Sequence, residues 1–273
     1  MSLRINQNID AFNSYRNLSV TQGQMSKSLE KLSSGYRINR AADDAAGLAI
    51  SEGLRAQTGG LKVAVRNAQD GISVVQTAEG ALTETHSILQ RMRDLAVQAK
   101  NDGALSDDDK AKADKEFQAL VSELDDISGK TSFNGTNLLD GTYTDKAFQV
   151  GANSDDTLEV SIGNMDSTTL LGGTQAITDA TTAGTALDAI DDAIDTVSDE
   201  RAGLGAVQNR LEHKINNLNV AVENLTASES RIRDTDMAAE MMNFTRSQIL
   251  SQAGTAMLAQ ANQAPQGVLS LLR

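Results

Sequence analysis

Two long stretches of the chain repeat an apolar residue every seven positions. The first carries Leu54, Leu61, Ala68, Val75, Leu82, Leu89 and Ala96, and the second carries Ile190, Val197, Leu204, Leu211, Leu218, Leu225 and Ile232. A seven-residue repeat places these side chains along one face of a helix, as in coiled coils. Helices of this kind that lie far apart in the sequence are natural antiparallel partners, so we predict that the two pack together in a bundle.

Shorter apolar stripes occupy both ends of the chain. Within residues 4–32 and beyond residue 236, large apolar side chains recur at spacings that place them on one helix face. We predict that the two end helices pair with each other and become ordered only on assembly, because one thin helix cannot cover another. The side chains expected in this terminal core are Ile5, Ile9, Leu29, Leu32, Leu258, Leu269 and Leu272.

Residues 33–44 interrupt the apolar pattern between the first end helix and the first long tract. Serine competes for backbone hydrogen bonds and glycine accepts a positive φ, so the run that begins at residue 33 favours a helix break. Two arginines then lie close in sequence to two aspartates, and small residues restart a helix at residue 45. We interpret the stretch as a hinge in which opposite charges fix how two helical blocks meet. Its residues are Ser33, Gly35, Arg37, Asp43 and Asp44.

The sequence between the two long tracts predicts a third helix and then a small β region. Ser106 and Asp109 form a capping-box pair at a helix start, and Gly129 is placed to end that helix. Asn134-Gly135 and Asp140-Gly141 are dipeptides typical of hairpin turns, and apolar residues alternate from 158 to 162 as in a strand. We expect irregular surface from there to residue 184.

These patterns together predict a mainly α protein. We expect an elongated antiparallel coiled-coil or helix bundle with a small β-hairpin region and with its N- and C-terminal helices paired. The paired ends, residues 1–43 and 234–273, would form a terminal coiled-coil core domain. Residues 44–233 would form a rod-like helical domain that carries the hairpin insert at about residues 131–184.

The composition narrows the classes of partner. The net charge is −13, which argues against nucleic acid because phosphate would be repelled. Cysteine is absent, so disulfides and thiolate metal sites are excluded. We find no apolar run of the length of a signal peptide or a membrane span, so we expect no membrane insertion. Composition alone would place the protein in the cytoplasm.

Catalytic motifs find little support in the sequence. Gly129-Lys130-Thr131 is similar to the end of a phosphate-binding loop, but Leu124 stands where that motif needs its first glycine. His86 and His213 lie in the long helical tracts, without the spacing of a zinc protease. We therefore expect no enzyme, no cofactor and no metal.

Several short stretches resemble the sequence motifs of bacterial flagellins. The stretches are LSSGYRIN at 32–39, ADDAAGLAI at 42–50, NAQDGIS at 67–73, QRMRDLA at 90–96, FNG at 133–135, SQAG at 251–254 and QANQ at 260–263, and the chain closes with LR. They cover both ends of the chain, in order. On these residues the chain is identified as a member of the flagellins, in a minimal form without large outer domains.

The resemblance implies a structural function. A flagellin polymerises into a helical tubular filament that a rotary motor turns for motility, so the first partner would be a second copy of the chain. The heptad residues Leu61, Val75, Leu82, Leu89, Leu204, Leu211, Leu218 and Leu225 would then form the assembly core, facing neighbouring subunits. Flagellins leave the cell through a dedicated channel without a cleaved signal, which implies an extracellular location in the flagellum. An export chaperone and the filament cap and hook-junction proteins would be further partners.

The resemblance also implies a surface for innate immunity. In flagellins a helix face at 90–95 is bound by a Toll-like innate receptor, and Arg91, Leu95 and Glu116 match the residues of that face. The simpler interpretation is that these residues are exposed and seam positions of a coiled coil.

Two other structural functions stay open on the sequence. A hook–filament junction protein shares the design of the ends, although the full motif at 33–50 and the stretch 90–96 favour a flagellin. A coiled-coil scaffold would explain the heptads but neither the hairpin insert nor the matching ends.

Overall fold

The computed structural model of the chain describes residues 7–103 and 105–271, with only the backbone described from 264 to 271. Contacts between Cα atoms divide the chain into two compact units. We call Met1–Ala56 with Asn224–Arg273 the terminal unit, and Gln57–Glu223 the bundle unit. The unit boundaries fall inside helices α2 (Ala45–Ala99) and α5 (Ala180–Arg233). The sequence placed its domain boundaries at helix ends instead, at 43/44 and 233/234, and that division stays a prediction.

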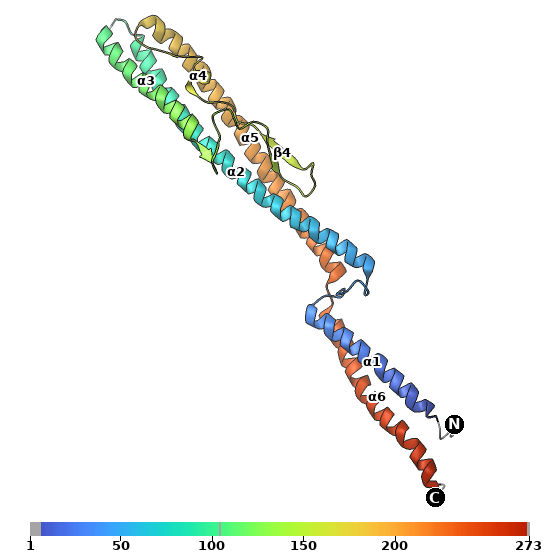
Figure 1. Ribbon diagram of the computed structural model, residues 1–273. Coiled ribbons are helices and arrows are strands. Elements are labelled where there is room, and N and C mark those ends of the chain that lie inside the picture. The colour runs from blue at the N-terminus through green and yellow to red at the C-terminus, as the bar shows by residue number, and fades with distance from the viewer. Residues whose placement is uncertain (1–6, 104, 272–273) are drawn as a thin grey trace. The chain divides into compact units, whose positions relative to one another are not determined.

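In the bundle unit, α3 (Asp107–Lys130) and α5 lie beside α2 (Figure 1). Two ion pairs show that α2 and α5 are antiparallel, because the later residue of α2 pairs with the earlier residue of α5. Arg93 Nε lies 2.6 Å from Asp191 Oδ1, and Arg201 Nη2 lies 3.8 Å from Glu79 Oε1. The turn between α2 and α3 is held by Lys110, which is 2% exposed and pairs with Asp102. The prediction of a mainly α fold with antiparallel heptad helices is confirmed.

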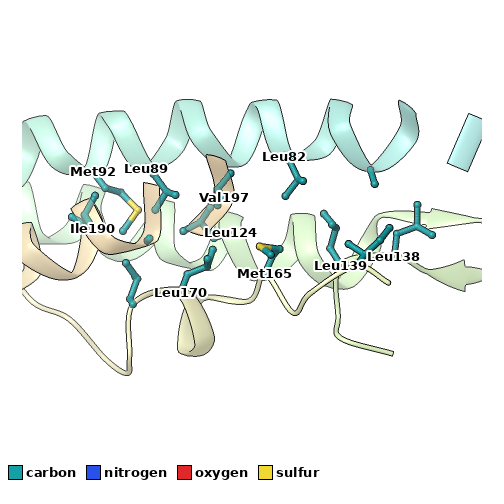
Figure 2. Close-up of a cluster of buried hydrophobic side chains, with 14 of the residues drawn as sticks. Leu82, Leu89, Met92, Leu124, Leu138, Leu139, Met165, Leu170, Ile190 and Val197 are labelled. Atoms are coloured by element: carbon teal, nitrogen blue, oxygen red, sulfur yellow. The ribbon is translucent and has the colours of Figure 1, made fainter. Parts of the chain in front are cut away.

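The heptad residues of the two long tracts form the core of the bundle unit. Leu89 and Met92 of α2 lie beside Val197 and Ile190 of α5, and Leu82 lies further along the same face of α2 (Figure 2). The third helix contributes Leu124 and Phe117, so the apolar stripes of three helices meet in one cluster. Burial of each large aliphatic side chain contributes about 1.5–3 kcal/mol, which makes this cluster the main source of stability of the unit.

A small β region follows α3. Strands β1 (Ser132–Phe133) and β2 (Thr136–Asn137) are joined by Asn134 and Gly135, whose φ angles are +48° and +78°. Both positive φ values belong to the type I′ turn that the dipeptide predicted. Strands β3 (Lys146–Gln149) and β4 (Thr157–Val160) form a second antiparallel hairpin.

The Asp140-Gly141 dipeptide does not make a hairpin turn, so this prediction was wrong. Asp140 Oδ1 instead accepts hydrogen bonds from the backbone N–H and the hydroxyl of Thr142, at 3.0 and 2.6 Å. The loop that joins β3 to β4 lies at residues 150–156. An aspartate that bonds the backbone two residues on makes a local turn wherever it stands, so the dipeptide alone does not specify paired strands.

The expectation of irregular surface up to residue 184 was also wrong. A short helix, α4 (Ser167–Leu170), begins this stretch, and α5 begins at Ala180 rather than after 184. Leu170, Leu171 and Ile177 are buried and belong to the core of the bundle unit. Asp114 and Asp125 of α3 accept hydrogen bonds from the backbone of this segment, at 2.9 Å each. The segment therefore packs against the helices of the bundle unit and covers part of their apolar core.

Asp166, the N-cap of α4, gives a prediction about pH. Burial raises its pKa, but hydrogen bonds donated by Thr169, Asn164 and Thr168 outweigh burial and lower the pKa to about 2. Because the folded-state pKa lies below the unfolded value of 3.8, this stabilisation is fully present above pH 4 and is lost as the pH falls through 2.

We expect Asp166→Asn to remove about 2 kcal/mol of stability at pH 7, since Asn still caps the helix but carries no charge. Denaturant unfolding at pH 7 and at pH 2 measures the difference. The gap between variant and wild type should close at the lower pH, and a gap independent of pH would contradict the assignment.

The terminal unit contains two further helices. Helix α1 (Ile9–Ser34) lies antiparallel beside α6 (Met237–Leu271) (Figure 1). Asn8 caps α1 by accepting a hydrogen bond from Ala11 N–H at 3.0 Å, and its Nδ2 donates to the carbonyl of Ala261 at 2.6 Å. The predicted pairing of the end helices is confirmed. Over the described chain, none of the helices has an apolar run able to cross a membrane.

Candidate assembly surface

The two end helices meet along a heptad seam made largely of small side chains. The less exposed positions follow alternating steps of three and four: Ala11, Ser14, Leu18, Thr21, Met25, Ser28 and Leu32 on α1, and Phe244, Ser247, Ser251, Gly254, Leu258 and Ala261 on α6. Such spacing is that of a and d positions in a coiled coil. The small residues let the backbones approach closely, and a Cβ on Gly254 would lie 3.2 Å from Leu18 Cδ1.

Most large apolar side chains of both helices point away from this seam. They are between 49% and 72% exposed, and we call them the outer apolar face: Ile9, Phe12, Tyr15, Val20 and Leu29 on α1, and Met241, Met242, Ile249, Leu250 and Met257 on α6. On α6 a shallow groove runs from Met241 to Leu250. Scattered exposed apolar residues are ordinary, but ten large ones on two paired helices, four of them lining one groove, mark a contact surface.

The structure divides the predicted terminal core between these two surfaces. Leu32 and Leu258 are half-buried in the seam, whereas Ile9 and Leu29 lie on the outer apolar face. Ile5 and Leu272 lie outside the described residues, as does the side chain of Leu269. The apolar residues that the sequence pattern assigned to one helix face therefore lie on two faces. Small residues (serine, alanine and glycine) fill much of the seam, and most of the large apolar residues lie on the outer apolar face.

The predicted hinge pairs with the segment between α5 and α6 in the terminal unit, and we call the two paired segments the joint. Gly35, at φ +75°, ends α1, and its backbone N–H donates to the carbonyl of Lys31 at 2.8 Å. Arg37 N–H donates to the carbonyl of Arg233 at 2.7 Å, and Thr235 N–H donates to the carbonyl of Gly35 at 3.0 Å. The chain leaving α1 and the chain entering α6 are therefore paired as in a short antiparallel ladder.

The opposite charges of the hinge do not pair as expected. Within the described chain both carboxylates bond to nearby backbone instead. Asp43 Oδ2 accepts from the backbone N–H groups of Arg40 and Asn39, at 3.0 and 3.2 Å, in the turn before α2. Asp44 Oδ1 accepts from Gly47 N–H in the first turn of α2, at 2.8 Å. The bonds from Arg40 and Asn39 hold the pKa of Asp43 below its usual value. These bonds are favoured over ion pairs because the backbone donors lie within three or four residues of each carboxylate. No long arginine side chain then has to lose conformational entropy.

The hinge arginines bond elsewhere. Arg37 Nη2 donates to the carbonyl of Ile232 at 2.6 Å, so this arginine also belongs to the joint. Arg40 Nε pairs with Glu30 at 2.8 Å. Ser33, the first residue of the predicted hinge, is an exposed residue of the last turn of α1.

Arg233 is a joint residue that the sequence pattern did not single out. Its guanidinium lies 2.6 Å from Glu52 Oε1 and 4.8 Å from the centre of the Tyr36 ring. The side chain is only 15% exposed, so the ion pair and the cation–π contact are partly shielded from water. The sequence signal was the cluster Arg231 to Asp236 that ends the second heptad tract, but its partners lie almost two hundred residues away.

Most of the predicted heptad residues are buried by contacts within the same chain. Leu61, Val75, Leu82, Leu89, Leu204, Leu211 and Leu218 are all buried in the bundle unit, and Leu225 is half-exposed in the terminal unit. A side chain that is already buried within one subunit offers no surface to the next. The expectation that these seven residues face neighbouring subunits is therefore corrected, and the apolar surface that stays exposed belongs to the terminal helices.

The three residues of the predicted immune surface do not share one environment. Arg91 Nε and Nη2 donate to Glu116 Oε1 at 2.9 and 2.6 Å, and both side chains are about half exposed. Leu95 is only 3% exposed and belongs to the core of the bundle unit. A residue buried to that extent cannot contact a receptor directly, so the surface hypothesis keeps only the Arg91–Glu116 pair.

Comparison with known proteins gives the family of this chain. Residues 5–144 match the family described as "Bacterial flagellin N-terminal helical region", and residues 187–272 match "Bacterial flagellin C-terminal helical region". The chain is 57% identical to a flagellin of Halalkalibacterium halodurans, over 98% of this chain and 99% of that protein. It is 47% identical to the flagellar filament 33 kDa core protein of Treponema phagedenis, again over 98% and 99%.

A solved structure shares part of the fold. The crystal structure of Bacillus cereus flagellin is 40% identical, with a TM-score of 0.50, over 56% of this chain and 88% of that one.

Proposed function

This chain belongs to the bacterial flagellin family, and from that premise we propose that its subunits join through the outer apolar face of α1 and α6. As a flagellin it is a structural subunit of the bacterial flagellar filament, and its place is that extracellular appendage. The way in which such subunits join depends on the apolar surfaces that a single chain leaves uncovered.

The composition of α6 supports the proposed contact. One side of this helix packs on α1, yet Met242 and Ile249 on the opposite side are 64% and 60% exposed. Large apolar side chains thus lie on two sides of α6, and a single partner helix covers only one of these sides. Other copies of the subunit supply the missing surface, since each side chain buried there contributes about 1.5–3 kcal/mol.

The two predicted domains take different parts in this proposal. The paired ends, residues 1–43 and 234–273, line the core of the filament, where the outer apolar face is covered. Residues 44–233 form the outer part of the wall, and their own heptad core holds the subunit together. The joint around Gly35 and Arg233 keeps the two end helices in register at the point where they leave the longer helices.

The proposal is tested by a single charge on the outer apolar face. Ile249→Asp should prevent filaments from growing on added seeds, as seen by electron microscopy, because a carboxylate buried without a partner costs several kcal/mol. Ile249→Leu is the matched control, which keeps the apolar volume and should polymerise as the wild type does. Normal filaments from Ile249→Asp would show that this face is not the contact.

Flagellin membership also supports a set of transient partners. A newly made subunit exposes the outer apolar face, and a cytoplasmic export chaperone that holds an apolar helix in a groove would keep it soluble. We propose further that the subunit leaves the cell without a cleaved signal and meets the filament cap and hook-junction proteins on assembly. A role as hook–filament junction protein is not favoured by any observation on this chain.

The Arg91–Glu116 pair is the remaining candidate for contact with a Toll-like innate receptor. Both groups are exposed on the bundle unit, so either can exchange its partner for a receptor side chain. We expect Arg91→Ala with Glu116→Ala to weaken receptor activation by the monomer at least tenfold, or about 1.4 kcal/mol. The double variant should unfold at nearly the wild-type temperature, because surface ion pairs contribute about 0–1 kcal/mol. Unchanged signalling by the folded variant would exclude the pair.

A further inference from the structure

The described methionines fall into two classes according to where they lie. Met237, Met241, Met242 and Met257 are all on α6 and are 48% to 64% exposed. Met92 and Met165 are 3% exposed or less, in the core of the bundle unit, and Met25 is half-buried in the seam with α6. The exposed thioethers are thus gathered on one helix, and three of them belong to the outer apolar face.

Methionine is the only sulfur-containing residue of this chain, because cysteine is absent. A thioether is flexible and apolar, and it adapts to an uneven contact surface. It is also oxidised by peroxides: the sulfur gives an electron pair to one oxygen of hydrogen peroxide, the O–O bond breaks, and the second oxygen leaves as water. The product is a sulfoxide, which is polar and accepts hydrogen bonds.

We propose that the exposed methionines of α6 are a site of oxidation by peroxide-class oxidants, and that their sulfoxides block addition of the subunit to a filament. The inference rests on the proposed function, since it requires the outer apolar face to become dry on assembly. A sulfoxide left without a hydrogen-bond donor in such a contact carries the penalty of any unsatisfied buried polar group. Met241 and Met242, which line the groove of α6, are the central pair.

The same geometry limits oxidation to the free subunit. Once the outer apolar face is covered by neighbouring copies, the oxidant no longer reaches the sulfur atoms. Met92 and Met165 are shielded in both states, because they lie inside the bundle unit. Oxidation therefore acts as a control on growth and leaves existing filaments intact.

The test compares monomers and filaments treated with hydrogen peroxide. Peptide mass spectrometry should find sulfoxide at the four α6 methionines of the monomer at least tenfold faster than at Met92 and Met165. The treated monomer should lose at least tenfold in seeded filament growth. In preformed filaments Met241, Met242 and Met257, which belong to the outer apolar face, should react at least tenfold more slowly than in the monomer.

Leucine variants separate oxidation at α6 from other damage. One variant combines Met237→Leu, Met241→Leu, Met242→Leu and Met257→Leu, and a second combines only Met242→Leu and Met257→Leu, the two most exposed sulfurs. Because these residues belong to the proposed contact, each variant is compared with its own untreated growth rate. Peroxide should change the rate of the first variant by less than twofold and should slow the second less than it slows the wild type. Growth of wild type that carries sulfoxide at all four positions would overturn the inference, as would equal loss of growth in both leucine variants.

The Ile249→Asp variant distinguishes failure of the proposed contact from failure of the oxidation inference. If untreated Ile249→Asp grows normally, the proposed contact is wrong and the oxidation site loses its basis. If Ile249→Asp does not grow but the oxidised wild type does, the contact stands and only the oxidation inference is overturned.

Discussion

Ending the chain after Ala259 is expected to abolish filament formation completely while leaving the bundle unit folded. The truncation removes the last turns of α6, including Ala261, whose carbonyl accepts the hydrogen bond from Asn8 Nδ2 at the start of α1. The start of α1 and the end of α6 then lose their mutual support. Electron microscopy after addition of seeds measures filaments, and circular dichroism measures the fold.

The truncated chain also tests the proposed chaperone. If the export chaperone holds this end of α6, binding of chaperone should be lost together with polymerisation. Ala253→Ser, a small change on the exposed part of the same helix, serves as a full-length control that should keep both. Filaments built from the truncated chain would show that the end of α6 is not part of the assembly core.

Leu211→Asp is expected to unfold the bundle unit or to bring it to the edge of unfolding. Leu211 is fully buried in a cluster with Ala68, Val150 and Leu158, and its Cδ1 lies 3.3 Å from the position that a Cβ on Gly71 would take. Loss of a buried leucine side chain alone costs about 2–5 kcal/mol. The carboxylate adds several kcal/mol in an apolar cluster, against a total stability of about 5–15 kcal/mol for a domain.

Two variants calibrate this result. Leu211→Ala should lose about 2–5 kcal/mol and stay folded, since it leaves a cavity without a charge. Asn209→Asp carries the same charge two residues away on the exposed side of α5, and should change stability by less than about 0.5 kcal/mol. Thermal unfolding followed by circular dichroism compares the three. A wild-type melting temperature for Leu211→Asp would mean that the heptad face is not buried.

The helices and their breaks could be predicted from local sequence. A heptad repeat as long as that of α2 and α5 specifies a helix with one buried face, whatever lies opposite it. The break at Gly35 and the hairpin at Asn134-Gly135 were predictable because each needs a positive φ that few other residues accept. Recognition of the family likewise required no structure, because its motifs are short and local.

Partners far apart in the sequence could not be predicted in this way. Arg37 and Asp43 are close in sequence, yet each bonds a backbone group instead of the other. Arg233, the last residue of α5, contacts Glu52 and Tyr36 only because the start of α2 and the segment after α1 lie against it. The burial of Leu171 and Ile177 in a polar loop depends in the same manner on the helices beneath it.

The division of apolar residues between inside and outside was decided by tertiary structure alone. The sequence determined that both the long tracts and the ends are amphipathic, but amphipathic pattern does not say which face meets the chain itself. In the bundle unit three helices surround the leucines, so Leu89 and Leu204 are covered within one subunit. In the terminal unit two helices meet through small residues, so Phe12 and Ile249 stay exposed. Two helices enclose only one seam, and the surface for assembly is what that geometry leaves uncovered.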